Sequence, residues 1–221
     1  QVFWHGMPYN PLNVDSVYFF ATVHVGSDGA LAAELPAFND YMQKVSSIMK
    51  MGRTYSDVAV YIPYEDGVMA GAYPKEQQRV WVWGQHEMRF IDLPSELEGR
   101  HPLWINRSFL KEAAYEDGFL KCGDAEFSAL YIDVEYMDSR SLDHILVLAK
   151  QGLPVCIKQP PGQPGKVKSE TFGERLEMLM GLSNVSAETD EIFDSAPLIK
   201  GDSLPAYWCR VVGDEYYIFF A

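Results

Sequence analysis

Between residues 57 and 157, short runs of strand-forming residues alternate with stretches of helical periodicity, and the connections between them are short. Residues 58–62, 127–134 and 153–157 are rich in apolar and aromatic side chains, which is typical of buried strands. A helix is predicted after Asp138, where apolar residues recur at helical spacing. Because strands joined by helices form parallel sheets, the predicted fold class is α/β.

The simplest architecture for this pattern is a flavodoxin-like three-layer sandwich with a mainly parallel sheet, plus an N-terminal strand and helix and a C-terminal β-hairpin. Helical spacing predicts a helix over residues 35–49, and Gly213-Asp214 joins two strand-like runs in the tail. We also expect a helix over residues 102–113 and a turn-rich loop over residues 64–71. The predicted units are residues 1–55, 56–204 and 205–221.

The net charge of −13 argues against nucleic acid and anionic membranes as partners, because both are bound through clustered Lys and Arg side chains. No apolar run approaches about 18 residues, so no transmembrane helix is predicted. The three cysteines are too few and too widely spaced to indicate a disulfide framework or a metal site. The sequence therefore predicts a globular protein that binds no metal.

The sequence lacks the motifs of familiar nucleophiles and cofactor sites. Cys156 lies in a predicted sheet strand, but no glycines flank it at the spacing of a nucleophile elbow, and a buried thiol is the default interpretation. The PPGQPG segment at residues 160–165 is a poor phosphate-binding loop, because its prolines have no N–H to donate. No cofactor is predicted.

Two places in the chain carry candidate binding residues. His5 is flanked by glycine and proline just after a short apolar run, where loops often carry function. Glu65 and Asp66 follow a predicted strand, so we expect them at the carboxyl edge of the sheet, where ligands of open α/β folds bind. Ordinary turn chemistry, with glycine next in the chain, is the alternative interpretation of this acidic pair.

A series of short motifs runs along nearly the whole chain. The motifs are FWHGMPY at residues 3–9, VYFFATVHV at 17–25, MG at 51–52, DVAVYIPY at 57–64, DGFL at 117–120, GLPV at 152–155, PPGQPG at 160–165, YWCR at 207–210 and YYIFF at 216–220. In their order and spacing they resemble the C-terminal half of the α-L-rhamnosidases of glycoside hydrolase family 106 and their relatives.

In that family a catalytic barrel precedes a domain similar to class I glutamine amidotransferases, and β-sandwich sugar-binding domains follow. The resemblance implies that residues 1–55 end the barrel, that residues 56–204 form the amidotransferase-like domain, and that residues 205–221 lead into a sandwich. The catalytic glutamates and the calcium site of the family then belong to polypeptide upstream, so we carry over no catalytic residue. His5 and Tyr9 would lie near the barrel mouth and contact sugar.

By this resemblance we expect a non-catalytic accessory region of a glycoside hydrolase, which meets carbohydrate through its parent enzyme. The resemblance also allows a homo-oligomer and favours the periplasm or secretion. Two alternatives stay open. The chain is either a free-standing binding or oligomerisation module of α/β type, or an independent hydrolase that uses Cys156 as its nucleophile.

Overall fold

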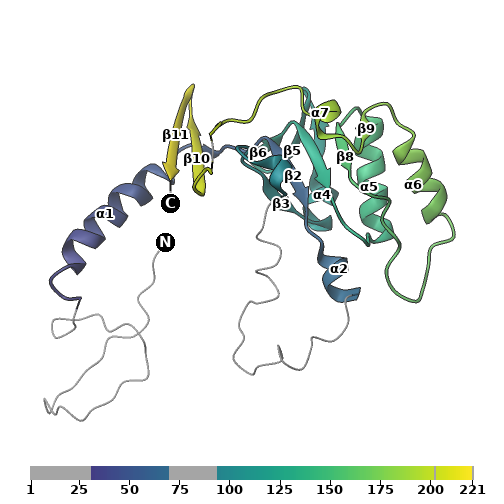
Figure 1. The fold of residues 1–221 in the computed structure, drawn as a ribbon, viewed down its shortest axis with the longest axis horizontal. Helices are drawn as coiled ribbons and strands as arrows, with labels where there is room; N and C mark the ends of the chain where they lie inside the picture. The colour runs from purple at the N-terminus through teal and green to yellow at the C-terminus, as the bar shows by residue number, and fades with distance from the viewer. Residues whose placement is uncertain (1–30, 70–93, 202, 221) are drawn as a thin grey trace, which may run out of the picture.

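The computed structural model describes residues 31–69, 94–201 and 203–220. A five-stranded sheet with all-parallel pairing forms its centre (Figure 1). In spatial order the strands are β3 (Leu103–Ile105), β2 (Val58–Tyr61), β7 (Ala129–Ile132), β8 (Val155–Ile157) and β9 (Val185–Ser186). Counted along the chain this is the order 2-1-3-4-5 of flavodoxin-like folds, so the predicted fold class is confirmed.

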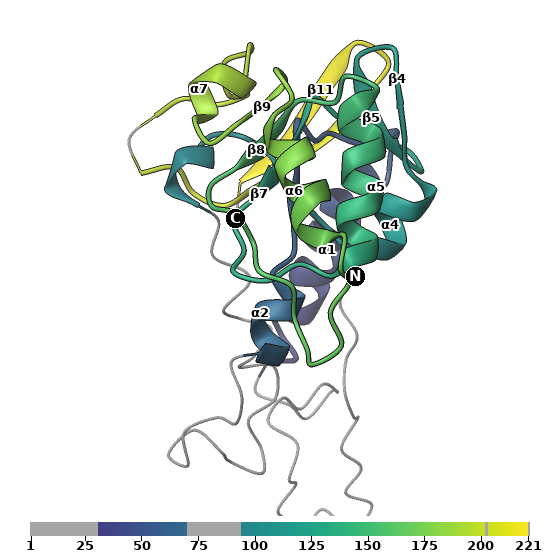
Figure 2. The same ribbon diagram turned by 90° about the vertical axis from the view of Figure 1, so that its right-hand side faces the viewer.

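Helices cover both faces of this sheet. One face carries α4 (Arg107–Glu112), α5 (Ser139–Lys150) and α6 (Phe172–Met180), and the opposite face carries the 3-10 helix η2 (Ser95–Leu97) and α7 (Thr189–Ile192) (Figure 2). Side chains of β2 alternate between the two cores: Ala59 and Tyr61 pack under α4 and α5, whereas Val58 and Val60 pack with η2 and α7. None of the described helices has the length and apolar character needed to span a membrane.

The helix predicted after Asp138 is α5. The Asp138 carboxylate accepts hydrogen bonds from the backbone N–H groups of Arg140 and Ser141, at 3.0 and 3.2 Å, and so caps the first turn. The apolar positions expected to share one face, among them Leu142 and Ile145, are buried in the larger core. Helix α6 packs beside α5 and buries Phe172 and Leu179 in the same core.

A second sheet is small and antiparallel, and consists of β4 (Ala114–Glu116), β5 (Phe119–Cys122) and β6 (Ala125–Phe127). Its tight turns contain Asp117, Gly118 and Gly123, which all have positive φ. Leu120 and Phe127 extend the core that lies under α4 and α5.

The third sheet joins the tail to the segment before β2. It contains β1 (Arg53–Thr54), β10 (Tyr207–Val212) and β11 (Glu215–Phe220), in the order β1–β10–β11 and with antiparallel pairing throughout. Gly52 precedes β1 with a φ of +55°, and a Cβ there would lie 1.9 Å from the carbonyl oxygen of Val211, so only glycine fits. The buried His101 ring packs edge-on against Tyr207 and Trp208 and attaches the hairpin to the α/β body.

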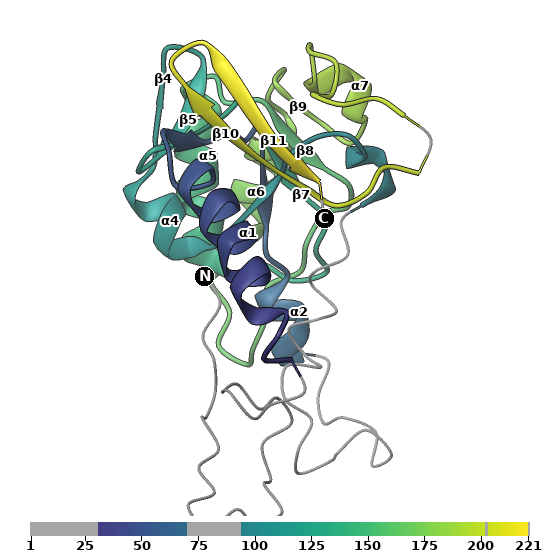
Figure 3. The same ribbon diagram turned by 90° about the vertical axis from the view of Figure 1, so that its left-hand side faces the viewer.

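Helix α1 (Leu35–Ile48) lies beside this hairpin and projects away from the α/β body (Figures 1 and 3). It matches the helix predicted over residues 35–49, with a proline in its first turn. None of its residues is buried.

Two local predictions are wrong. The helix expected over residues 102–113 is instead β3 followed by α4, because Leu103–Ile105 pairs with β2 and Asn106 starts a new helix as its N-cap. The loop expected over residues 64–71 contains α2 (Tyr64–Met69), which directly follows Pro63. Strand β9 and helix α7 have two and four residues, too few to leave a periodic pattern in the sequence.

Candidate functional site

A cavity of about 510 Å³ opens where β2 and β3 end, at the carboxyl edge of the parallel sheet. Its walls come from the end of β2, from α2, from the first residues of α4, from Asp138, and from the loop at Pro164 and Gly165. Strand β2 lies between β3 and β7, which are the next two strands of this sheet along the chain. From β2 the chain goes to β3 on one side and then to β7 on the other, so the strand order reverses at β2, and open α/β sheets bind ligands near such a reversal.

The polar side of this cavity includes Tyr61, Glu65 and Asp138, which form a hydrogen-bonded group together with the buried Ser141. The Tyr61 hydroxyl contacts the Ser141 hydroxyl oxygen at 2.9 Å and both carboxyl oxygens of Glu65 at 3.3 Å. The Ser141 hydroxyl donates to the Asp138 carboxylate. Arg107, at the start of α4, approaches the same carboxylate with its guanidinium at 3.5 Å. Residues from β2, α2, α4 and α5 are thus brought together.

The two carboxyl groups in this group have opposite pKa shifts. Burial, together with the negative charge and hydrogen bonding of Asp138, raises the pKa of Glu65 to about 7. Burial alone would also raise the pKa of Asp138, but hydrogen bonds from the Ser141 hydroxyl and from two backbone N–H groups outweigh it and lower that pKa. At neutral pH, Asp138 is therefore ionised, while Glu65 exchanges between its neutral and ionised forms.

The acidic pair predicted from the sequence divides between two roles. Glu65 lines the cavity. The Asp66 carboxylate accepts hydrogen bonds from the backbone N–H groups of Glu135 and Tyr136, at 3.0 and 2.7 Å. Asp66 thereby fastens α2 to the loop after β7 and holds Glu65 in place. His5 and Tyr9, the other two predicted binding residues, lie outside the described residues.

Sequence reasoning missed Tyr61, Ser141 and Arg107 as parts of this site. Tyr61 is the last of four buried residues in β2, so its sequence pattern indicates a core residue. Its ring is buried, but its hydroxyl hydrogen-bonds to Ser141. A tyrosine as the last residue of a buried strand, four residues before a glutamate, is the local signal that was available. Ser141 and Arg107 carry no comparable signal, because they meet Tyr61 and Asp138 only through the tertiary fold.

Cys156 does not have the geometry of a nucleophile. It lies in the middle of β8 and is fully buried in the smaller core, and its thiol hydrogen-bonds to the carbonyl oxygen of Ala187, at 3.7 Å. Burial raises the pKa of this thiol to about 11, so almost none of it is thiolate at neutral pH.

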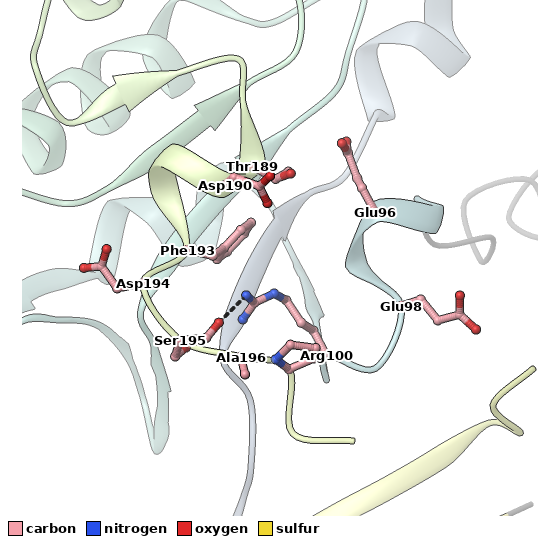
Figure 4. A pocket seen from close by; sticks show the side chains of 10 residues that line it. Glu96, Glu98, Arg100, Thr189, Asp190, Phe193, Asp194, Ser195 and Ala196 are labelled. Atoms are coloured by element: carbon pink, nitrogen blue, oxygen red, sulfur yellow. Dashed lines mark hydrogen bonds between the residues drawn. The ribbon is translucent and has the colours of Figure 1, made fainter. Parts of the chain in front are cut away.

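A second cavity, of about 340 Å³, lies between η2 and the segment that follows α7 (Figure 4). The Arg100 guanidinium points into it, donates to the carbonyl oxygen of Ser195 at 2.6 Å and lies 4.1 Å from the centre of the Phe193 ring. Acidic residues also line this cavity, but Glu98 and Asp194 point away from the guanidinium in opposite directions (Figure 4). In the part of the chain that the structure describes, no group of three His, Cys, Asp or Glu residues could hold a metal ion.

An apolar groove of about 270 Å³ runs between α1 and the hairpin strand β11. Tyr41, Val45 and Ile48 of α1 and Ile218 of β11 line it. Unlike the cavity at Glu65, it offers almost no polar groups, so it has the character of a packing surface.

Searches of protein families, of curated proteins and of solved structures find no match to this chain.

Proposed function

We propose that this chain is a non-catalytic accessory region of a carbohydrate-active glycoside hydrolase of the α-L-rhamnosidase type. The order and spacing of the motifs from FWHGMPY to YYIFF support the enzyme class. The geometry of the described residues supports the accessory role, through the apolar surface of α1 and the hairpin and through the properties of the candidate reactive groups.

The exposed apolar residues of α1 carry the proposal. Tyr41 and Ile48 lie two helical turns apart on one side of α1, yet their residues are 50% and 39% exposed, and no residue of this 14-residue helix is buried among the described residues. Tyr216 and Phe220 on the adjacent β11 are also half exposed. Exposed apolar side chains on neighbouring elements are typical of a face that packs against another part of a larger protein.

The candidate reactive groups favour a supporting role over catalysis. Glycoside hydrolysis needs two carboxyl groups about 5 to 9.5 Å apart, on either side of the bond to be cleaved. Glu65 and Asp138 are instead close enough for hydrogen bonding and charge repulsion to couple them. Cys156, which the alternative of an independent hydrolase requires, is buried inside a strand.

One observation favours the alternative of a free-standing oligomerisation module. β11 lies at the edge of its sheet, and its sequence EYYIFF has high β-propensity and only one charge. A second copy of the chain pairing along β11 would cover the same surface.

The experiment compares the chain with the longer polypeptide encoded around it, using Ile48→Glu and the control Gln43→Glu. Gln43 lies on the opposite side of α1 by helical periodicity. We expect no cleavage of aryl α-L-rhamnosides by the chain alone, and activity in the longer polypeptide that Ile48→Glu reduces and Gln43→Glu leaves unchanged. Turnover by the purified chain that a single substitution abolishes would overturn the proposal. A dimer of the chain alone that Ile48→Glu dissociates would support the oligomerisation module instead.

A further inference from the structure

The cavity at Glu65 differs from the other two in combining an apolar wall with a polar floor. Tyr64, Val68 and Met69 of α2 supply the wall, and these residues are 64%, 62% and 38% exposed. Tyr61 and Glu65 lie on the polar side. The volume of about 510 Å³ is within the range of about 300 to 1,000 Å³ that is usual for small-molecule sites.

The two carboxyl groups of the floor are held differently. One oxygen of Asp138 accepts from the N–H groups of Arg140 and Ser141 and from Arg107, and the other accepts from the Ser141 hydroxyl. The Glu65 carboxyl group interacts with the Tyr61 hydroxyl and is coupled to Asp138 by charge and hydrogen bonding. Because Glu65 lines the cavity, a ligand bound there can reach its carboxyl group.

Glu65 is also suited to a partner that both donates and accepts. Because its pKa is raised to about 7, the carboxyl group is partly protonated at neutral pH, and its O–H then donates while its carbonyl oxygen accepts. Hydroxyl groups are partners of that kind.

Anionic ligands fit this cavity poorly. The start of α5 would attract a phosphate, but the Asp138 side chain already occupies its N–H groups. Arg107 is paired with that same carboxylate, and the Asn106 side chain accepts from the first N–H groups of α4. Of the residues that the structure describes, the charged ones that line the cavity are therefore two carboxyl groups and one guanidinium that is already paired.

We propose that this cavity binds a neutral saccharide unit, whose hydroxyl groups hydrogen-bond to Glu65 and whose C–H face packs on the ring of Tyr64. Aromatic rings present flat apolar faces on which the C–H face of a sugar packs, and the rim of a sugar ring presents vicinal hydroxyl groups. A sugar can therefore contact the apolar wall and hydrogen-bond to the polar floor at the same time. The inference rests on the proposed function for the choice of rhamnose as the first sugar to test.

The test titrates the full chain with L-rhamnose, D-galactose, D-glucose and inorganic phosphate, and follows backbone amide shifts by NMR. We expect saturable binding of at least one sugar with a Kd of about 1 mM, and weaker binding of phosphate. Tyr64→Ala and Glu65→Ala should each weaken sugar binding about tenfold, because each removes one main contact. Tyr216→Ala, a half-exposed tyrosine on β11, is the matched control and should have no effect.

Binding of none of the sugars, binding that both cavity variants leave unchanged, or a preference for phosphate would each overturn this inference. Circular dichroism of each variant checks that it is folded, and Tyr64 is exposed enough that its removal should not disturb the core. The proposed accessory role is judged separately, by the effect of Ile48→Glu on the longer polypeptide. The two proposals can therefore fail independently.

Discussion

Replacing Glu65 by glutamine should stabilise the protein at alkaline pH and leave its stability nearly unchanged at acidic pH. Glutamine has nearly the same shape as glutamate and retains a hydrogen-bonding group for Tyr61, but it never acquires a charge. The effect depends on the pKa of Glu65 in the folded protein. Its pKa is raised from 4.5 to about 7, mainly by burial.

The sign follows from proton linkage. Between the two pKa values the folded protein binds more protons than the unfolded chain, so the free energy of unfolding falls as the pH rises from 4.5 to about 7. A shift of this size corresponds to about 3 kcal/mol before solvent screening. Because Glu65 is only partly buried, we reduce the expected effect to about 1–2 kcal/mol.

The assay is urea unfolding followed by circular dichroism, at several pH values from about 4 to about 8. We expect Glu65→Gln to exceed the wild-type protein by about 1–2 kcal/mol at about pH 8 and to match it at about pH 4, below the pKa of the unfolded chain. Glu112→Gln, at an exposed position at the end of α4, controls for the loss of one negative charge. An equal stability difference at all pH values, or the same pH dependence in both variants, would refute the reasoning.

Two further predictions concern groups outside the cavity. Iodoacetamide should leave Cys156 unmodified in the native protein, because this residue is buried in β8, and should alkylate it once urea unfolds the chain. Mass spectrometry of the peptides measures the modification. Alkylation of Cys156 in the native protein would contradict this burial. Asp57→Asn should destabilise the protein by about 3–5 kcal/mol in urea unfolding, because it leaves the buried Arg100 cation without its carboxylate partner at 3.2 Å. Asp117→Asn, which removes the exposed partner of Lys121, is the control and should leave stability unchanged. A small effect of Asp57→Asn would mean that water or another group compensates Arg100.

The parts of the fold that the sequence predicts are those with a local pattern. Helix α5 has an N-cap and an apolar stripe, and the hairpin β10–β11 has two apolar runs around Gly213-Asp214, so both are recognisable without the rest of the chain. Strand β3 has only three residues, and its extended conformation depends on pairing with β2. Its Leu-Trp-Ile sequence runs directly into α4, and the combined segment therefore has the spacing of one longer helix.

The candidate site was predictable only in its position. A carboxylate just after a buried strand is expected at the carboxyl edge of a parallel sheet, and Glu65 lies there. Other members of the site come from distant parts of the chain: Ser141, which accepts a hydrogen bond from Tyr61, lies 80 residues away from it. Short-range patterns contain no information on such pairs, so the sequence could not separate Glu65 from Asp66.

What separates these carboxyl groups is how completely the fold itself supplies hydrogen-bond donors to each. Asp57 receives Arg100 and a backbone N–H group, Asp66 receives two backbone N–H groups, and Asp138 receives four donors. Each of these three is satisfied by the protein and stabilises it. Glu65 is partly buried, with the Tyr61 hydroxyl as a donor and the Asp138 carboxylate close by, and both its burial and the Asp138 charge raise its pKa. A ligand whose hydroxyl groups donate hydrogen bonds to Glu65 would supply the donors that the fold does not provide. Ligand binding should therefore lower the pKa of Glu65 as well as occupy the cavity.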